Sequence, residues 1–220
     1  MRTSDAGPSN LLEQLEIRTL IENWVVWRDS GEWDRFATLW HPDGRMITTW
    51  SQAPAAEFIE RSKRAWESGA LKVLHGLEGS TIEIEGPRAL AQTKMYIMQR
   101  GEIDGVAVDV ICRGRFWDLL EKAGGRWMLL LRQPVYELDS MSTVDPGQSL
   151  SLDPDLLARF PEGYRRLAYL QTRLGLDVSR TMPGTRGPEI EALKQRTRRW
   201  LAGGDYEAPS EVAASPRRGR

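Results

Sequence analysis

The spacing of apolar residues changes near residue 72, and this change limits the folds open to the chain. Before it, apolar residues recur every three or four positions, as in Leu20, Trp24 and Trp27, which is typical of amphipathic helices. After it, they alternate with polar residues over long runs, as at Ile82 and Ile84, which is typical of strands. Helices followed by a run of strands predict an α+β fold with the helices on one face of a sheet.

Turn residues divide the two regions into elements. We expect helices over residues 11–29, 32–40 and 55–67, a short strand over 45–50, one long or bulged strand over 72–77 and 81–85, and strands over 90–100, 106–120 and 126–138. Gly31 follows the first helix and can take the left-handed conformation that often ends a helix. Gly76 and Gly79 interrupt the long strand and indicate a bulge or bend.

The composition shifts after Asp139, and a C-terminal extension begins there. We expect a flexible N-terminus over residues 1–10, a main domain over 11–142, a helical extension over 143–205 and a disordered tail over 206–220. Helical patterns cover residues 155–174 and 189–201, and Pro161 and Gly163 are expected to kink or split the first of them. The extension would form a lid over the domain or a strap across a neighbouring subunit.

Charge, hydropathy and cysteine content exclude several classes of protein. The 30 basic and 31 acidic residues leave no basic excess with which to bind nucleic acid. No apolar run is long enough for a membrane span and the N-terminus has no apolar signal core, so we expect a cytoplasmic protein. The single cysteine, Cys112, excludes a disulfide framework, and the two histidines lack metal-ligand spacing. We therefore expect no metal and no cofactor.

Nine tryptophans indicate either a well-packed core or a pocket for flat apolar ligands. Trp24 and Trp27 fall on the first expected helix, and Trp40 and Trp50 flank the first expected strand. Tryptophans at helical spacing are usually core residues. Four of them close to the mouth of the expected pocket, however, favour a small aromatic substrate, and the candidate is a compound with two rings.

Three segments together resemble a known family. Residues 17–46 carry a helical run, the motif DSGEWD and the turn HPDG; residues 73–86 carry HGLEGSTIEIEG; and residues 114–137 carry a hairpin with GGRW. In this order they resemble the nuclear transport factor 2-like superfamily, and within it the SnoaL-like branch of polyketide cyclases, scytalone-type dehydratases and a cofactor-free dehydrochlorinase. The resemblance implies a cone-shaped fold, in which three N-terminal helices pack on a curved antiparallel sheet around a deep apolar pocket. We also expect a homo-oligomer, either a dimer or a trimer.

The resemblance further implies a catalytic pair, because dehydratase-like members use a histidine on the sheet and an aspartate at the end of the first helix. His75 and Asp29 match these positions. Imidazole titrates near neutral pH and can take or give a proton, and a carboxylate fixes its tautomer. At a helix C-terminus the dipole disfavours a carboxylate such as Asp29 unless a partner compensates its charge. The alternative is a solvated aspartate and a core histidine.

Further candidate residues lie on the expected strands. Arg132 interrupts the apolar run WMLLLRQPVY and points either to the outer face or to the pocket, where family members place an arginine near the leaving group. Tyr96 and Met98 share a strand face that would line the cone, and Tyr96 is either a proton donor to a leaving hydroxyl or a core residue. Asp109 is either a pocket acid or part of a solvated face, and Trp117 lies further along the same strand as a candidate substrate contact.

These residues favour a cofactor-independent lyase or dehydratase acting on a hydroxylated aromatic compound. Similarity in fold type and length to the lignin-dimer lyases of sphingomonads implies a diarylpropane diol that loses water and formaldehyde through a quinone methide to give a stilbene. The alternatives are a polyketide cyclase or steroid-type isomerase with Asp29 or Asp109 as the base, and a non-catalytic binding protein or dioxygenase small subunit.

Overall fold

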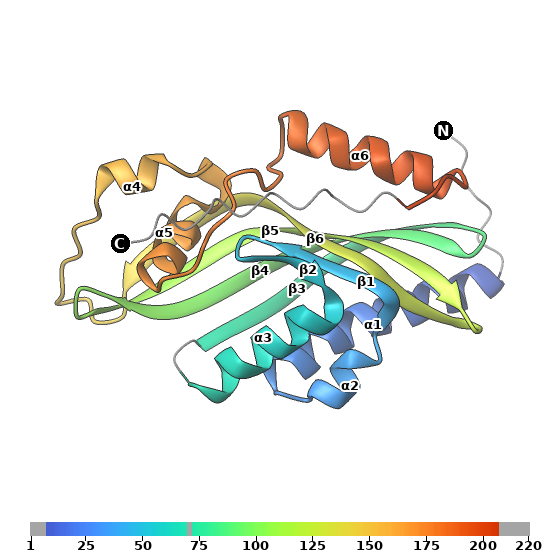
Figure 1. The fold of residues 1–220 in the computed structure, drawn as a ribbon, viewed down its shortest axis with the longest axis horizontal. Helices are drawn as coiled ribbons and strands as arrows, with labels where there is room; N and C mark the ends of the chain where they lie inside the picture. The colour runs from blue at the N-terminus through green and yellow to red at the C-terminus, as the bar shows by residue number, and fades with distance from the viewer. Residues whose placement is uncertain (1–7, 70–71, 207–220) are drawn as a thin grey trace, which may run out of the picture.

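A long curved sheet with helices on both faces forms the centre of the computed structural model, which describes residues 8–69 and 72–206 (Figure 1). The first part of the chain forms α1 (Pro8–Asp29), α2 (Trp33–Ala37), β1 (Trp40–Thr48), β2 (Ser51–Pro54) and α3 (Ala55–Glu67). The second part forms β3 (Lys72–Glu85), β4 (Arg88–Ile103), β5 (Val106–Ala123) and β6 (Arg126–Thr143). Three N-terminal helices and four long strands match the expected order, and Gly31 ends α1 with a φ of +74°.

The sheet has six strands in the order β2-β1-β6-β5-β4-β3. It is mixed, because β1 runs parallel to β6 while the other neighbours are antiparallel. Among the described strands, only the pairing of β1 with β6 departs from the expected antiparallel sheet: α3 and β3–β5 intervene between these two strands, and a connection of this length permits parallel pairing. The short edge strand β2 was not expected. β3 is one strand whose register shifts between Leu77 and Ser80, as its glycines indicate.

The two faces of the sheet carry different helices. Figure 1 shows α1–α3 on one side and α6 (Pro188–Leu201) on the other. The indole N–H of Trp117 on β5 donates a hydrogen bond to Oγ1 of Thr197 on α6 at 2.9 Å. Arg88 on β4 donates to the backbone oxygen of Trp200 and lies over its ring. The outer face of β4 and β5 is therefore buried under α6 at one end of the sheet.

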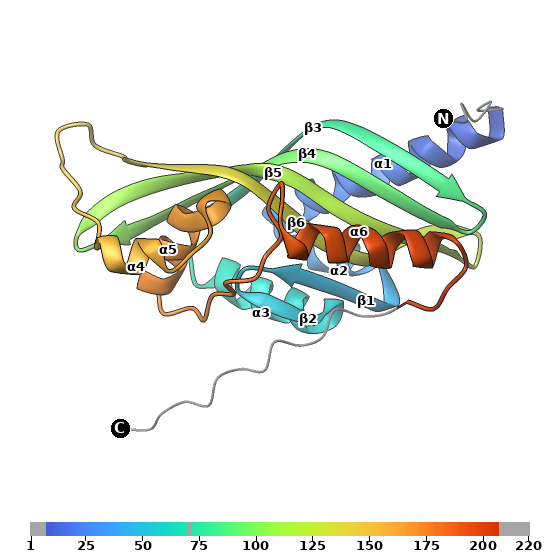
Figure 2. The same ribbon diagram turned by 90° about the horizontal axis from the view of Figure 1, so that it is seen from above.

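The extension also supplies the other C-terminal helices. It forms α4 (Pro154–Ala158), the 3₁₀ turn η1 (Glu162–Tyr164) and α5 (Arg165–Arg173) before α6. Pro161 and Gly163 thus split the expected helix. Figure 2 shows these elements beyond the region covered by α1–α3. At the other end of the chain, α1 already begins at Pro8, so residues 8–10 are helical rather than flexible. The remaining expectations for residues 1–7 and 207–220 lie outside the described residues. Within the described residues, no helix is long and apolar enough to cross a membrane.

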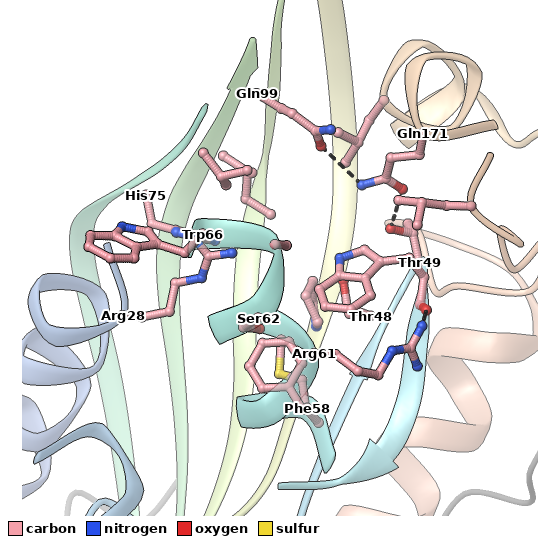
Figure 3. Close-up of a pocket in the computed structure, with 18 of the residues that line it drawn as sticks. Arg28, Thr48, Thr49, Phe58, Arg61, Ser62, Trp66, His75, Gln99 and Gln171 are labelled. Atoms are coloured by element: carbon pink, nitrogen blue, oxygen red, sulfur yellow. Dashed lines mark hydrogen bonds between the residues drawn. The ribbon is translucent and has the colours of Figure 1, made fainter. Parts of the chain in front are cut away.

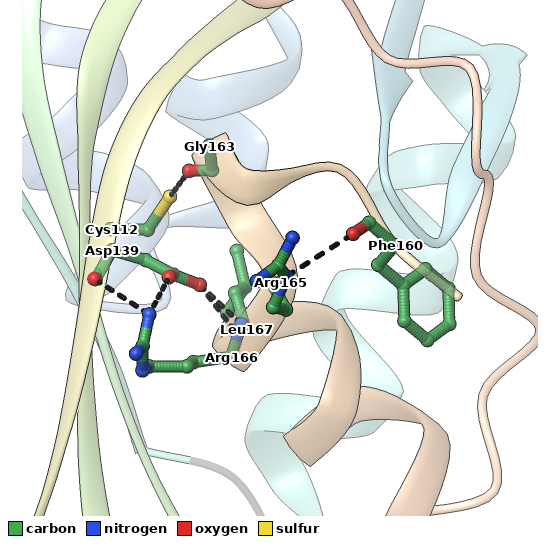
Figure 4. Close-up of polar contacts among 7 residues, drawn as sticks. All are labelled: Cys112, Asp139, Phe160, Gly163, Arg165, Arg166 and Leu167. Carbon is green, nitrogen blue, oxygen red and sulfur yellow. Dashed lines mark hydrogen bonds and ion pairs between the residues drawn. The ribbon is translucent and has the colours of Figure 1, made fainter. Parts of the chain in front are cut away.

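Asp139 on β6 attaches α5 to the sheet (Figure 4). Its Oδ2 accepts hydrogen bonds from the backbone N–H groups of Arg166 and Leu167, and its Oδ1 accepts one from Nη1 of Arg166 at 3.2 Å. The first N–H groups of a helix have no partner within the helix, so this buried carboxylate supplies one. It fixes where α5 begins and holds α5 against β6.

Replacing Asp139 should therefore destabilise the protein. Asp139→Ala leaves the buried N–H groups of Arg166 and Leu167 without acceptors, and we expect a loss of about 1–3 kcal/mol in the free energy of unfolding. Asp139→Asn keeps one acceptor oxygen and should lose less. Urea unfolding followed by tryptophan fluorescence measures both changes. Equal stability of wild type and Asp139→Ala would contradict the anchoring role.

Candidate active site

A cavity of about 310 Å³ lies between α1, α3, the inner face of the sheet and α5 (Figure 3). Its apolar wall is largely aromatic and includes Trp24, Trp50, Phe58, Trp66, Phe116, Tyr136, Met46, Val73, Ile97, Ala65 and Pro134. Leu167 and Leu176 of the extension complete the wall, and Thr49, Gln99 and Gln171 form a chain of hydrogen bonds at that end. The volume and the mixture of aromatic walls with a few polar groups are typical of a small-molecule site.

His75 and Asp29 meet at the wall of this cavity. Nδ1 of His75 lies 2.8 Å from Oδ1 of Asp29, and the backbone N–H of His75 donates to Oδ2 at 2.6 Å. Asp29 is the last residue of α1 and His75 lies on β3, so a helix end and a strand are joined by two contacts. The backbone N–H compensates the carboxylate for its unfavourable place at a helix C-terminus.

The tautomer of His75 follows from these contacts. An ionised carboxylate only accepts hydrogen bonds, so the proton on the imidazole is assigned to Nδ1, which faces Asp29. Nε2 is then the unprotonated nitrogen left for a ligand, since the ring itself lines the cavity. The ring of Trp24 meets the imidazole edge to face, with centroids 5.4 Å apart, and limits its rotation.

Burial and charge keep the imidazole neutral. Burial lowers the pKa of His75, Asp29 opposes this effect, and the positive charges of Arg28 and Arg132 lower the pKa further. Burial acts to raise the pKa of Asp29, but its hydrogen bonds to His75 and the positive charge of Arg28 oppose this effect, and that pKa lies below its usual value. At neutral pH the pair is a carboxylate and a neutral imidazole, the form in which Nε2 can accept a proton.

Arg132 lies behind the aromatic wall rather than in the cavity. Its Nε and Nη2 donate to Oδ1 and Oδ2 of Asp118 at 2.8 and 2.7 Å, and both side chains are fully buried. The guanidinium lies between two rings, 4.3 Å from the centroid of Trp24 and 4.2 Å from that of Phe116. The interpretation of Arg132 as a residue on the outer face is wrong, and so is its placement in the cavity lining. It acts on the site through its charge and through the rings that it supports.

Four candidate residues point away from the cavity. Tyr96, Met98 and Asp109 lie on the outer face, where Tyr96 packs against Arg113 and Asp109 pairs with Arg100. Trp117 is buried on the same outer side, but beneath α6. Their assignment to the pocket is corrected, because the residue next to each of three of them faces inward: Ile97, Gln99 and Phe116 line the cavity.

The tryptophans divide in a similar way. Trp24 and Trp50 line the cavity, as expected. Trp40 packs in the core against Phe36 and Phe58, and Trp27 lies under the guanidinium of Arg35; neither lines the cavity. A third cavity tryptophan, Trp66, was not expected as a site residue.

Sequence reasoning missed most of the polar cavity residues. Phe58, Ser62 and Ala65 recur at helical spacing on α3, so their shared face was visible as a pattern. Arg28 directly precedes Asp29, but nothing in the local sequence indicates that its side chain turns inward. Gln171 belongs to the extension, and no local pattern relates it to Gln99. The residues that the structure describes contain no group of three or more ligands for a metal ion.

The sequence of this chain matches a known family over more than half of its length. A family model described as a SnoaL-like domain matches residues 9–133. The chain belongs to the SnoaL-like family. The matched region ends within β6 and does not reach the helical extension.

Relatives of this SnoaL-like protein match along nearly the whole chain. It is 38% identical over 213 residues to a PEP2-like protein and to pea pathogenicity protein 2, both of Fusarium vanettenii, with 91% of each chain covered. Among solved structures, a candidate scytalone dehydratase of Novosphingobium aromaticivorans aligns with a TM-score of 0.50 at 17% identity, covering 64% of this chain and 98% of that one. A type 2 hexachlorocyclohexane dehydrochlorinase aligns with a TM-score of 0.52 at 11% identity, covering 66% and 95%. At these identities the structural likeness shows the shared fold alone.

The lowered pKa of His75 should be measurable directly. We expect its ring signals in NMR to titrate below the ordinary imidazole value of about 6.5, and to titrate lower still in Asp29→Asn, because the carboxylate that raises the pKa is removed. The unfolded chain takes up this proton near pH 6.5 while the folded chain resists it, so the free energy of unfolding should fall as the pH drops below about 6.5. His41→Gln assigns the signals, since the chain has two histidines. A pKa of His75 at or above the ordinary value would contradict the expectation.

The buried ion pair predicts an asymmetric response to substitution. Arg132→Met leaves Asp118 buried without its partner and should lower the free energy of unfolding by about 3–5 kcal/mol. The double variant Arg132→Met/Asp118→Leu removes both charges and should recover much of this loss. Urea unfolding of the single and double variants measures the difference. If the double variant were as unstable as the single one, the unpaired carboxylate would not be the cause.

Proposed function

We propose that this protein is a cofactor-independent lyase of the dehydratase type, which acts on a hydroxylated aromatic compound with His75 as the base. The contact of 2.8 Å between Nδ1 of His75 and Oδ1 of Asp29, at the wall of an aromatic cavity, carries the proposal. The carboxylate orients the ring and stabilises the imidazolium once it forms, in the manner of the Asp–His half of a catalytic triad.

The reaction needs only the groups that the cavity provides. In an elimination of water, Nε2 of His75 takes a proton from a carbon atom, and the C–H electron pair becomes the second bond of an alkene. The C–O bond on the adjacent carbon breaks, and its electrons leave with oxygen. The departing hydroxide takes the proton back from the imidazolium, so water is released and neutral His75 is restored. The apolar wall excludes bulk water during these steps.

A diarylpropane diol is our candidate substrate. The benzylic hydroxyl leaves as water when the para-phenol loses its proton, which gives a quinone methide. Nε2 of His75 then takes the proton of the primary hydroxyl, and the C–C bond breaks to release formaldehyde. The electron pair of that bond forms the alkene of a stilbene and restores the aromatic ring as a phenolate, which takes the proton back from the imidazolium. Aromatic residues on several sides of the cavity, among them Trp24, Trp50 and Phe116, support a substrate with two rings.

Substitution of the pair tests the proposal. The protein is incubated without added cofactor with a diarylpropane diol, scytalone and a chlorinated cyclohexane, and products are followed by chromatography and by formaldehyde release. We expect turnover of at least one of these compounds, and a loss of about 10²–10⁴-fold in kcat/KM for His75→Ala, because the proton acceptor is removed. Asp29→Asn should also lose activity strongly, because the amide no longer holds the productive tautomer.

His41→Ala is the matched control. His41 is the other histidine of the chain, lies outside the cavity lining and interacts with Asp43. Its replacement should leave kcat/KM within about twofold of the wild-type value, a change of less than 1 kcal/mol in the activation free energy. Full activity of a folded His75→Ala protein would exclude His75 as the base. Turnover that responds to neither His75 nor Asp29 would place the chemistry elsewhere.

A further inference from the structure

The charged side chains that line the cavity are all basic. Three arginines reach it, Arg28 from α1 and Arg61 and Arg64 from α3, and no Asp or Glu is among its lining residues in the part of the chain that the structure describes. Asp29 lies behind the imidazole and does not line the cavity. This local excess contrasts with the formal net charge of −1 for the whole chain. The cavity therefore favours a ligand that carries negative charge.

Arg28 is the deepest of the three cations. Its side chain is 11% exposed, and burial lowers its pKa from the ordinary value although Asp29 opposes this effect. An arginine remains protonated under such conditions, so a guanidinium cation lies in a largely apolar cavity. Figure 3 shows its end directed into the space between α3 and the sheet.

Only some of the N–H donors of Arg28 have acceptors among the residues that the structure describes. Nη1 donates to Oδ1 of Asp29 at 3.2 Å, but the same oxygen also interacts with Nδ1 of His75, and Oδ2 accepts from the backbone of His75. One carboxylate thus serves three donors. Nε of Arg28 has no partner among the described residues, and neither does Oγ of Ser62, a buried hydroxyl on the α3 side of the cavity. A buried donor without a partner costs free energy, and a ligand that accepts its hydrogen bond would remove this cost. Unpaired donors at a cavity are therefore expected where a ligand binds.

The two arginines of α3 occupy a different position. Nη2 of Arg61 donates to the backbone oxygen of Trp50 at 2.9 Å, and its guanidinium lies 5.0 Å from the Trp50 ring centroid. Arg64 is exposed to solvent, as is Trp66 at the same end of α3. These cations surround the cavity without being buried in it. They would attract an anion toward the entrance, whereas Arg28 is placed to bind it.

We propose, on the basis of the function above, that the ligand of this cavity is an aromatic carboxylate and that Arg28 binds its carboxylate group. The planar guanidinium offers N–H donors in the geometry that a carboxylate accepts, and such charge-assisted bonds are stronger than neutral ones. The ring system of the ligand would lie among Trp24, Phe58 and Phe116. A hydroxylated aromatic substrate that also carries an acid group, such as a diarylpropane diol with a carboxylate on one ring in place of the neutral diol, would then be held by that group at Arg28, one residue from the aspartate that orients the base.

Binding of two probes of nearly equal shape tests the inference without any turnover. The full-length protein is titrated with 2-naphthoate and with 2-naphthamide, and binding is measured by calorimetry and tryptophan fluorescence. We expect wild type to bind the carboxylate at least about tenfold more tightly than the amide, since a hydrogen bond to a charged group is lost with the amide. Arg28→Gln should abolish this preference while it changes binding of the amide by less than about threefold. Arg28→Lys keeps the positive charge but lacks the planar guanidinium. Its preference for the carboxylate should lie between those of wild type and Arg28→Gln.

Two further variants serve as controls. Arg126→Gln removes an exposed cation that does not line the cavity and should keep the preference for the carboxylate, because exposed charges are screened by solvent. His75→Ala should also keep it, since Arg28 rather than the imidazole binds the anion. If His75→Ala is inactive but still prefers naphthoate, both proposals stand; if Arg28 discriminates the probes but no elimination is found, the proposed function fails alone.

Several results would overturn the inference. Equal affinity of wild type for the two probes would do so, and so would failure to bind either of them at millimolar concentration. A loss of preference in His75→Ala as large as that in Arg28→Gln would assign the anion to the imidazole. The comparison of the two probes on wild-type protein remains decisive if Arg28→Gln does not fold.

Discussion

The contact between the carboxylate of Asp29 and the backbone and ring of His75 determines how the helical layer meets the sheet. It joins the last residue of α1 to β3 across a sequence separation of 46 residues. Because both carboxylate oxygens are engaged by one residue, the position of the strand and the orientation of its imidazole are set together. The same contact determines where Arg28 lies, since Arg28 is the neighbour of Asp29 on α1. The positions of His75, Asp29 and Arg28 thus have a common structural origin.

A second buried pair supports this arrangement from behind. Arg132 and Asp118 are fully buried, and the guanidinium packs against the rings of Trp24 and Phe116. Both rings also contact the imidazole of His75. A buried ion pair is not by itself a source of stability, because both ions lose their hydration. Its contribution here is positional and electrostatic. It holds two aromatic walls in place and adds a positive charge that favours neutral His75.

Much of the architecture was predictable from the sequence, but the orientation of individual strands was not. Hydrophobic period and turn residues predict the helices and long strands, and the resemblance to the SnoaL-like family implies the pairing of His75 with Asp29. A period of two, however, defines two faces of a strand without saying which one is concave. Tyr96, Met98 and Trp117 were therefore assigned to the cavity in place of Ile97, Gln99 and Phe116. Helices cover both faces of β5 near Trp117, so residues 116–120 are all buried and burial could not separate the faces. The parallel pairing of β1 with β6 and the hydrogen bond between Gln99 and Gln171 join distant segments, and no local pattern encodes them.

The cavity wall contributed by α5 has a consequence for how such sites diversify. The His75–Asp29 pair and the wall at the far end of the cavity are encoded about a hundred residues apart, and Asp139 on β6 attaches the segment that forms this wall to the sheet. Mutation or recombination in the C-terminal segment can reshape ligand choice without altering the reactive groups. During synthesis the order is the same: β3, which carries His75, leaves the ribosome before α5, so the wall that α5 contributes is the last to be added to the cavity.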